Sequence, residues 1–241
     1  MKSTTGMERL ARDLGELGIT SGGTLMVHSS LSAIGWVEGG ASAVVRALIE
    51  ALGEDGTLAM PAATPQCAVP EPQTVFQAET TPTKMGAIPE AFRIWPGTLR
   101  SSHPLDSVCA RGPLAAEVTS VHPLAFSEGP GTPFGRIHDR EGTILLLGVG
   151  FNRCTALHYA ETLSEKRRTA TTRFPRIENG ETEWVEVLNV ADDNDRHFPI
   201  IGERYVAAGR AVRGKVGEAP CSLFPMRDLA DFAVDYFEST F

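Results

Sequence analysis

The sequence has few cysteines, and no two of them lie close together. Its four cysteines, Cys67, Cys109, Cys154 and Cys221, form no CxxC pair. This spacing is typical of free thiols in a reducing cytoplasm, and it argues against a disulfide framework or a structural zinc site. No apolar run reaches the roughly 18 residues that a membrane-spanning helix needs. The opening 19 residues have a helical period rather than a signal-peptide core. We therefore expect a cytoplasmic protein with neither a metal nor a membrane partner.

Positive charge is also scarce. Lysine and arginine total 22 against 30 aspartates and glutamates, so the formal net charge is −8. A nucleic acid is excluded as the main partner because its phosphates need a basic surface. A cationic small molecule would suit an acidic protein, although many soluble enzymes are acidic. The 241 residues, of which 42% are hydrophobic, predict one domain over 1–241 that can bury a core without staples.

Hydrophobic periodicity alternates between helical and extended patterns, which predicts an α/β fold containing a βαβ unit. The pattern predicts helices over 7–18, 41–52, 86–94, 114–120, 155–168, 198–208 and 226–238, and strands over 24–28, 56–61, 108–110 and 142–150. Residues 171–190 predict a hairpin with its turn at 178–181, and strands and turns are expected over 212–219. Strand 142–150 is apolar throughout, so we expect it near the centre of the sheet, covered on both faces. The proline-rich stretch 61–83 predicts a long loop, either a functional segment or a surface excursion.

A serine-rich turn follows the first predicted strand. Ser29, Ser30 and Ser32 supply hydroxyl and backbone N–H groups between the end of the strand and the start of the next helix. Such a turn can bind phosphate, and ordinary N-capping is the alternative. Neither GxGxxG nor GxxxxGK[ST] is present, so a Rossmann fingerprint or a P-loop is not supported.

His158 and Glu161 follow the central strand and are three residues apart, so they share one face of the predicted helix. Histidine is suited to taking a proton near neutral pH, and a carboxylate beside it raises its pKa. A buried histidine bonded to a neighbouring helix is the alternative reading. HxxE also fits metal ligation, but HExxH is absent and no third ligand is obvious. Cys154, one turn earlier, is a conceivable thiol nucleophile.

Three further groups of residues could meet a ligand or could be structural. His103 precedes a proline, which forces the backbone of His103 into an extended conformation. His103 could contact a ligand there, or it could be part of a rigid turn. Asp192, Asp193 and Asp195 form an acidic run that would attract a polyamine if it lined a cleft, and would otherwise be a solvated loop. His122, His138 and His197 are expected at the surface.

Several motifs occur together in one order along residues 7–235. They are Leu25-Met26-Val27-His28-Ser29-Ser30-Leu31-Ser32-Ala33-Ile34-Gly35, Gly56-Thr57-Leu58 through Pro61, Arg100-Ser101 with His103-Pro104, Ser107-Val108 with Ala110 and Gly112, Thr132-Pro133 with Gly135-Arg136, and Leu145–Val149 followed by Thr155, His158 and Glu161. Together they resemble the aminoglycoside 3-N-acetyltransferases, the antibiotic N-acetyltransferase family associated with antibiotic resistance. The resemblance implies a central mixed β-sheet flanked by helices, in the family's own fold rather than the GNAT fold.

The same resemblance implies an acetyl-CoA-dependent acyltransferase that acetylates the 3-amino group of a 2-deoxystreptamine ring. His158 would be the general base, Glu161 its partner or an amine contact, and Thr155 a donor to the thioester oxygen. The coenzyme would contact the residues Ser29, Ser30, Leu31, Ser32, Gly35, Ser107 and Val108. The amine substrate would contact Glu161, Asp192, Asp193 and His103. We expect direct transfer without an enzyme nucleophile, no metal, and a monomer or homodimer.

The sequence departs from the family pattern in the region expected to face the substrate. Relatives carry a loop rich in aspartate after the position of Pro61, whereas 62–67 contains no carboxylate. Phe76 is followed by Gln77-Ala78 instead of Asp-Pro, and Cys154 replaces a common asparagine. Three alternatives therefore stay open: acylation of a different amine metabolite, a metal-dependent hydrolase using His28, His103 and His158, and a non-catalytic coenzyme A binder.

Overall fold

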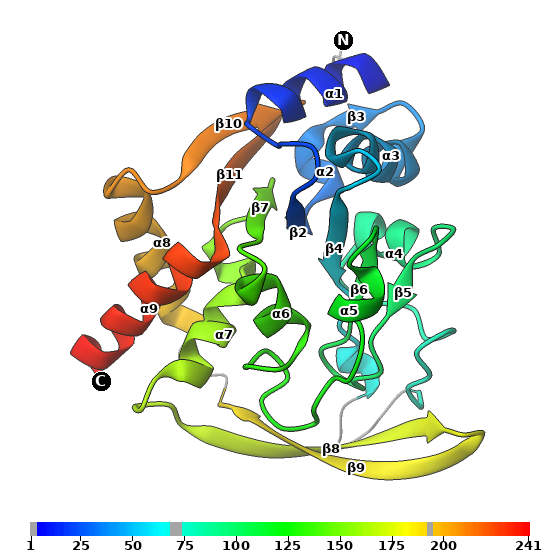
Figure 1. Cartoon of the computed structure of the whole chain (residues 1–241), viewed down its shortest axis with the longest axis vertical. Coiled ribbons are helices and arrows are strands. Elements are labelled where there is room, and N and C mark those ends of the chain that lie inside the picture. The colour runs from blue at the N-terminus through cyan, green and yellow to red at the C-terminus, as the bar shows by residue number, and fades with distance from the viewer. Residues whose placement is uncertain (1–3, 68–73, 192–194) are drawn as a thin grey trace.

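A seven-stranded mixed sheet forms the centre of the molecule (Figure 1). The computed structural model describes residues 4–67, 74–191 and 195–241. The sheet has the order β10-β11-β7-β2-β4-β6-β5. Its strands are β2 (Thr24–Ser29), β4 (Thr57–Pro61), β5 (Leu99–Arg100), β6 (Val108–Arg111), β7 (Thr143–Leu147), β10 (Val212–Val216) and β11 (Ala219–Pro225). The three middle strands β7, β2 and β4 pair in parallel, and every pairing outside them is antiparallel. The predicted α/β class with a central mixed sheet is confirmed.

Helices cover both faces of this sheet because side chains alternate along its strands. On β2, Leu25 and Val27 face one core while Met26 faces the other. The first core packs under α1 (Met7–Glu16), α3 (Gly40–Leu52) and α4 (Ala87–Arg93); the second packs under α6 (Pro133–Asp139), α7 (Ala156–Leu163), α8 (Phe198–Ala207) and α9 (Met226–Thr240). The remaining short elements are α2 (Leu31–Ile34), α5 (Ala115–Val118), η1 (Pro65–Cys67), η2 (Phe151–Arg153) and η3 (Asp195–His197).

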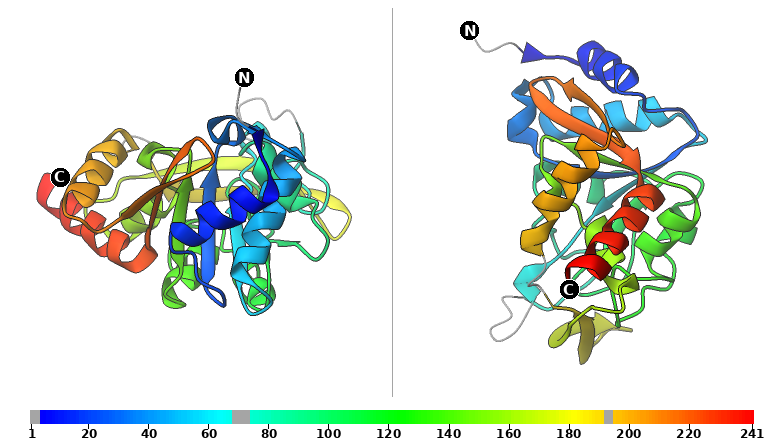
Figure 2. Two further views of the ribbon diagram at one scale, coloured as in Figure 1. Left: turned by 90° about the horizontal axis from the view of Figure 1, so that it is seen from above. Right: turned by 90° about the vertical axis from the view of Figure 1, so that its left-hand side faces the viewer.

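A two-stranded ribbon, β8 (Thr169–Glu178) and β9 (Glu181–Val190), lies outside the main sheet. It forms the end of the molecule opposite α1 (Figures 1 and 2). Its turn is made by Asn179 and Gly180, both with positive φ (51° and 83°), as a tight hairpin turn requires. The inner face of the ribbon packs into a third, small apolar cluster with Cys67 and Phe76. A further pair of short strands, β1 (Thr4–Thr5) and β3 (Trp36–Val37), lies beside the main sheet.

The helix expected over 155–168 is shorter than its pattern predicts. α7 ends at Leu163, and Ser164 adopts an extended conformation (φ −72°, ψ 137°). Glu238 of α9 accepts hydrogen bonds from the Ser164 hydroxyl and from the backbone N–H of Glu165, both at 2.7 Å. The expectation that the helix runs on to Arg168 is therefore wrong, because the carboxylate of a distant helix binds the chain where it leaves α7. The short elements α2, α6 and β5 were not anticipated as separate units.

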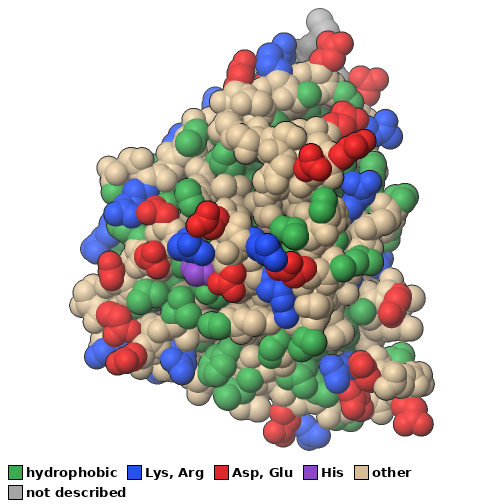
Figure 3. All heavy atoms as spheres, viewed as in Figure 1, with side chains coloured by type: hydrophobic (Ala, Val, Ile, Leu, Met, Phe, Trp, Pro, Cys, Tyr) green, Lys and Arg blue, Asp and Glu red, His purple; other side chains and the backbone are tan. Residues whose placement is uncertain are grey.

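Acidic and basic side chains are interspersed over the face of the molecule seen in Figure 3. Among the helices in the described ranges, none combines the length and the hydropathy needed to cross a bilayer.

Candidate active site

Two cavities open at the carboxyl ends of the parallel strands, where open α/β sheets commonly bind ligands. The larger has a volume of about 800 Å³ and the smaller about 250 Å³. Pro61, Met85 and Thr155 line both of them. The two spaces therefore adjoin at the start of α7, so that ligands in each could meet there.

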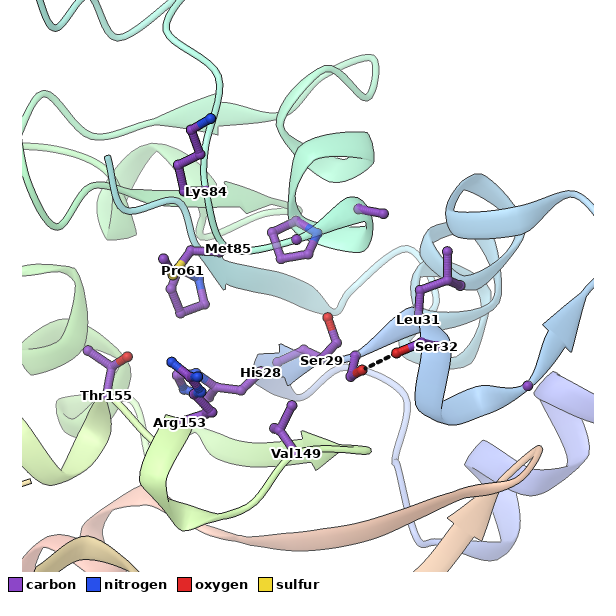
Figure 4. A pocket seen from close by; sticks show the side chains of 16 residues that line it. His28, Ser29, Leu31, Ser32, Pro61, Lys84, Met85, Val149, Arg153 and Thr155 are labelled. Atoms are coloured by element: carbon purple, nitrogen blue, oxygen red, sulfur yellow. Dashed lines mark hydrogen bonds between the residues drawn. The ribbon is translucent and has the colours of Figure 1, made fainter. Parts of the chain in front are cut away.

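The larger cavity is lined by the serine-rich turn. All five residues predicted for the coenzyme in this turn line it: Ser29, Ser30, Leu31, Ser32 and Gly35. The hydroxyls of Ser30 and Ser32 are 3.1 Å apart (Figure 4). Gly35 ends α2 with φ 91°, a conformation that side-chain-bearing residues rarely adopt. The turn thus presents hydroxyl groups to the cavity.

Other polar groups of the larger cavity suit a long, partly anionic ligand. Lys84 and Arg153 add two positive charges to its wall. Two buried polar atoms, Nε2 of His28 and Oγ of Ser29, have no hydrogen-bond partner within the described part of the chain. Buried polar atoms are rarely left unpaired, so atoms of a ligand are suited to complete these bonds. The volume also lies within the usual range for ligand sites.

His158 and Glu161 form a close pair on one face of α7. Nδ1 of His158 lies 2.7 Å from Oε2 of Glu161. The Glu161 side chain is only 2% exposed, whereas His158 is 21% exposed and lines the smaller cavity. Burial alone would lower the pKa of His158, but the hydrogen bond to Glu161 and the negative charges of Glu128, Glu161 and Asp106 raise it to about 9. The contact with Glu161 leaves Nε2 of His158 as the nitrogen available for proton transfer.

A carboxylate cluster also lines the smaller cavity. The Ser127 hydroxyl lies 2.5 Å from Oδ2 of Asp106 and 2.7 Å from Oε2 of Glu128. Nδ2 of Asn189, at the end of β9, lies 2.6 Å from the Ser127 hydroxyl and donates to Glu128 at 3.1 Å. Asp106, Glu128 and Asn189 all line the cavity beside His158. This cluster offers negative charge to a cation.

Sequence reasoning missed these carboxylates. Asp106 and Glu128 belong to separate loops, and no local spacing links them. The available signal was weak: Asp106 follows the His103-Pro104 turn, and Glu128 directly precedes Gly129-Pro130. The predicted acidic contacts Asp192 and Asp193 lie outside the described residues.

His103 occupies an interior position. Its side chain is fully buried, and Nδ1 accepts hydrogen bonds from the backbone N–H groups of Leu105 and Asp106 at 3.3 and 3.0 Å. It lines neither cavity. Burial and the nearby ring of His122 hold its pKa well below its usual range. Its position gives the predicted substrate contact no support, and the alternative, a rigid turn, agrees with this geometry.

His122 was expected at the surface, and that expectation is wrong. It is 6% exposed, and its ring lies 4.7 Å from that of His103. Nδ1 of His122 lies 2.8 Å from the Ser101 hydroxyl, and Nε2 lies 2.7 Å from the Ser127 carbonyl oxygen. The ring is thus held by a side chain 21 residues earlier and by a backbone carbonyl, neither of which the local sequence reveals.

Ser107 and Val108 do not reach the larger cavity. Ser107 lines the smaller one, where its hydroxyl donates to the Ala62 carbonyl and accepts from Arg100. Val108 is fully buried in the second core. Their positions give the predicted coenzyme contacts no support.

Cys154 is a poor candidate for a nucleophile. Its side chain is 1% exposed, and burial raises the pKa of its thiol to about 12.

His28, His103 and His158, the three ligands considered for a metal-dependent hydrolase, do not come together in a metal site. Over the ranges that the structure describes, no group of three or more histidine, cysteine, aspartate or glutamate side chains is placed to hold a metal ion.

Comparison with known proteins agrees with this geometry. A sequence model of the aminoglycoside 3-N-acetyltransferase family matches residues 26–238. The chain belongs to that family. It is 34% identical to the aminoglycoside N(3')-acetyltransferase-like protein YokD of Bacillus subtilis, over 95% of this chain and 91% of that protein. It is 35% identical to aminoglycoside N(3)-acetyltransferase III of Pseudomonas aeruginosa, over 93% of this chain and 90% of the relative.

A solved structure extends the comparison. The complex of AAC-IIIb with CoASH superposes with a TM-score of 0.91 at 28% identity, covering 99% of this chain and 98% of that one. The family and the enzyme class expected from the motifs are confirmed.

Proposed function

We propose that this enzyme transfers an acetyl group from acetyl-coenzyme A directly to a primary amine of an aminoglycoside, the 3-amino group of 2-deoxystreptamine, with His158 as general base. The observation that carries the proposal is the junction of the two cavities at Thr155, one turn from His158. A coenzyme in one cavity and an amine in the other would meet beside His158, a histidine whose pKa is raised.

The larger cavity is the proposed coenzyme site. Its serine hydroxyls suit the phosphates of coenzyme A, and the cations Lys84 and Arg153 make the wall of the cavity favourable to an anionic ligand. When bound, acetyl-coenzyme A supplies the acetyl group as a thioester. The hydroxyl of Thr155, at the junction, would donate a hydrogen bond to the thioester oxygen and stabilise negative charge that develops there.

His158 supplies the base that the reaction needs. An amine must be unprotonated to attack a thioester, and the new bond to carbon requires the loss of a further proton. Nε2 of His158 would take that proton while Glu161 stabilises the resulting imidazolium through Nδ1. The carbon–nitrogen bond forms as the carbon–sulfur bond breaks, and the departing thiolate takes the proton back from the His158 imidazolium, which returns the base to its neutral form. The buried thiol of Cys154 has no part in this scheme.

The smaller cavity is the proposed amine site. Asp106 and Glu128 carry negative charge beside His158 and would pair with ammonium groups of the substrate. Asp192 and Asp193 remain proposed contacts of the amine, on the resemblance alone. The enzyme class and the chemistry of this cavity together favour a polycationic acceptor.

A second acceptor class has one specific observation in its favour. Ala63 and Pro65, which line the smaller cavity, belong to the stretch 62–67 that carries no carboxylate. A smaller amine metabolite with fewer charges would need fewer acidic partners than an aminoglycoside does.

Release of coenzyme A thiol, measured across a panel of aminoglycosides and simple diamines, tests the proposal. NMR of the product identifies the acylated nitrogen. We expect turnover with a 2-deoxystreptamine aminoglycoside, and a loss of about 10²–10⁴-fold in kcat for His158→Ala. Near-normal turnover in that variant would remove His158 from the mechanism. Turnover with diamines alone would establish the second acceptor class.

A further inference from the structure

His28 is a buried histidine whose side chain contributes to the wall of the larger cavity. It lies at the carboxyl end of β2, paired in register with Leu146 of β7, and it is 6% exposed. Its Nε2 atom is buried and has no hydrogen-bond partner among residues 4–67, 74–191 and 195–241. A polar atom held in the interior without a partner is destabilising. The strand face itself does not require a polar residue, because Met26, two residues earlier on the same face, is apolar and fully buried.

The imidazole of His28 is uncharged near neutral pH. Burial lowers its pKa to about 4. A neutral imidazole has one N–H donor and one acceptor nitrogen. It is therefore poorly suited to a phosphate, which favours cations, and well suited to an amide or a carbonyl group.

The position of His28 along the cavity narrows the choice of partner. In Figure 4, Thr155 lies on one side of His28, and Ser29 and Ser32 lie on the other. A coenzyme A molecule with its phosphates near the serines and its thioester near Thr155 would pass His28 with its middle portion. That portion is the pantetheine arm, an uncharged chain that contains two amide groups.

We propose that Nε2 of His28 forms a hydrogen bond with an amide group of the pantetheine arm of coenzyme A, and so fixes how far the thioester reaches toward Thr155. This inference rests on the proposed function, because it assumes that the larger cavity holds the coenzyme. It assigns to His28 a coenzyme-binding role that is distinct from the proton transfer by His158.

Binding measurements on the intact protein test the assignment without relying on turnover. Calorimetry with coenzyme A and with pantetheine, which lacks the nucleotide, gives two dissociation constants for each variant. We expect His28→Leu to weaken both ligands by a similar factor of about 10. His28→Gln retains a donor and an acceptor and should bind both within about threefold of the unmodified protein. His138→Leu is the matched control, since His138 lies on α6 and lines neither cavity.

Two further measurements complete the design. Ser32→Ala should weaken coenzyme A more than pantetheine, since the serine turn is assigned to the phosphates. In ¹⁵N-histidine-labelled unmodified protein, the Nε2 resonance of His28 should shift when pantetheine is added. That experiment applies even if His28→Leu does not fold.

The outcomes separate this inference from the proposed function. If the unmodified protein does not bind coenzyme A, the proposed function fails. If it binds coenzyme A but the His28 resonance does not move with pantetheine, or His28→Leu binds pantetheine normally, only the role of His28 is refuted. A loss with coenzyme A but not with pantetheine would place His28 against the nucleotide and would also refute the proposal.

Discussion

Replacing Glu161 by glutamine removes a negative charge while nearly preserving the size of the side chain. In the structure, Oε2 of Glu161 lies 2.7 Å from Nδ1 of His158, and the carboxylate is almost fully buried. This contact is the largest of the influences that raise the pKa of His158 to about 9. Glu161→Gln should therefore lower that pKa, since the burial that opposes protonation remains.

The expected shift follows from the charge separation. Two unit charges about 4 Å apart interact by about 4 kcal/mol at an effective dielectric constant near 20. That energy corresponds to about three pKa units, so the pKa of His158 should fall to about 6 in the variant. At pH 7 most of His158 is protonated in the unmodified enzyme, because its pKa of about 9 lies well above that pH. In the variant the neutral form should predominate at that pH.

The profile of kcat/KM against pH from about 5.5 to 10 measures this shift. A general base must be unprotonated, so kcat/KM rises with pH until the pKa of the base is passed. The acid limb of Glu161→Gln should lie at least two pH units below that of the unmodified enzyme, with a lower plateau because the base is weaker. Ionisation of the substrate contributes equally to both profiles, so their difference reports on the enzyme.

Glu165→Gln is the matched control. Glu165 is exposed beyond the end of α7 and lines neither cavity, so its profile should not move. Coincident acid limbs for the unmodified enzyme and Glu161→Gln would show that Glu161 does not govern the protonation of His158, and the reasoning would be refuted.

Three other outcomes are expected. The pKa of His158 is raised from 6.5 to about 9, so the folded state holds this proton more tightly than the unfolded state does. About 3 kcal/mol of the free energy of unfolding that is present below pH 6.5 should therefore be lost as the pH rises to 9. Urea unfolding of the unmodified protein and of His158→Gln at several pH values checks this. Alanine substitutions of two helical glycines should have opposite effects in the same assay. The new methyl group of Gly15→Ala meets open space, so the free energy of unfolding should rise by up to ~1 kcal/mol. The methyl group of Gly202→Ala would clash with the Phe151 ring, so the free energy of unfolding should fall by about 1–3 kcal/mol. Iodoacetamide should leave Cys154 unmodified and activity intact, as mass spectrometry and a rate assay would show, and rapid alkylation with inactivation would contradict the assigned burial.

Periodicity predicted the sheet and its helices because burial on two faces leaves a direct trace in the sequence. The apolar run at 143–147 became β7, and Leu25, Met26 and Val27 alternate between the two cores as a strand requires. The close pair of His158 and Glu161 was also predictable, since three residues on a helix bring side chains to one face. Local spacing was sufficient where the contact itself is local.

Contacts between residues of different loops could not be predicted from local spacing in the sequence. Asp106 and Glu128 approach each other through Ser127 and Asn189, and Asn189 belongs to the distant strand β9. A polar neighbourhood in the sequence also does not distinguish solvent from internal partners, which is why His122 was misplaced. The limit is physical: tertiary hydrogen bonds determine these positions, and no short pattern encodes them.

The ribbon β8–β9 has a consequence for how this enzyme could change its acceptor. Asn189 and Val190, at the end of the ribbon, line the smaller cavity. Within the described residues, the ribbon forms a sheet separate from the seven-stranded sheet that carries the serine turn. Insertions or substitutions in the ribbon could therefore reshape the space offered to an amine while β2 and the turn that follows it stay in place. The selectivity for the amine acceptor could then change without a change in the affinity for the acetyl donor.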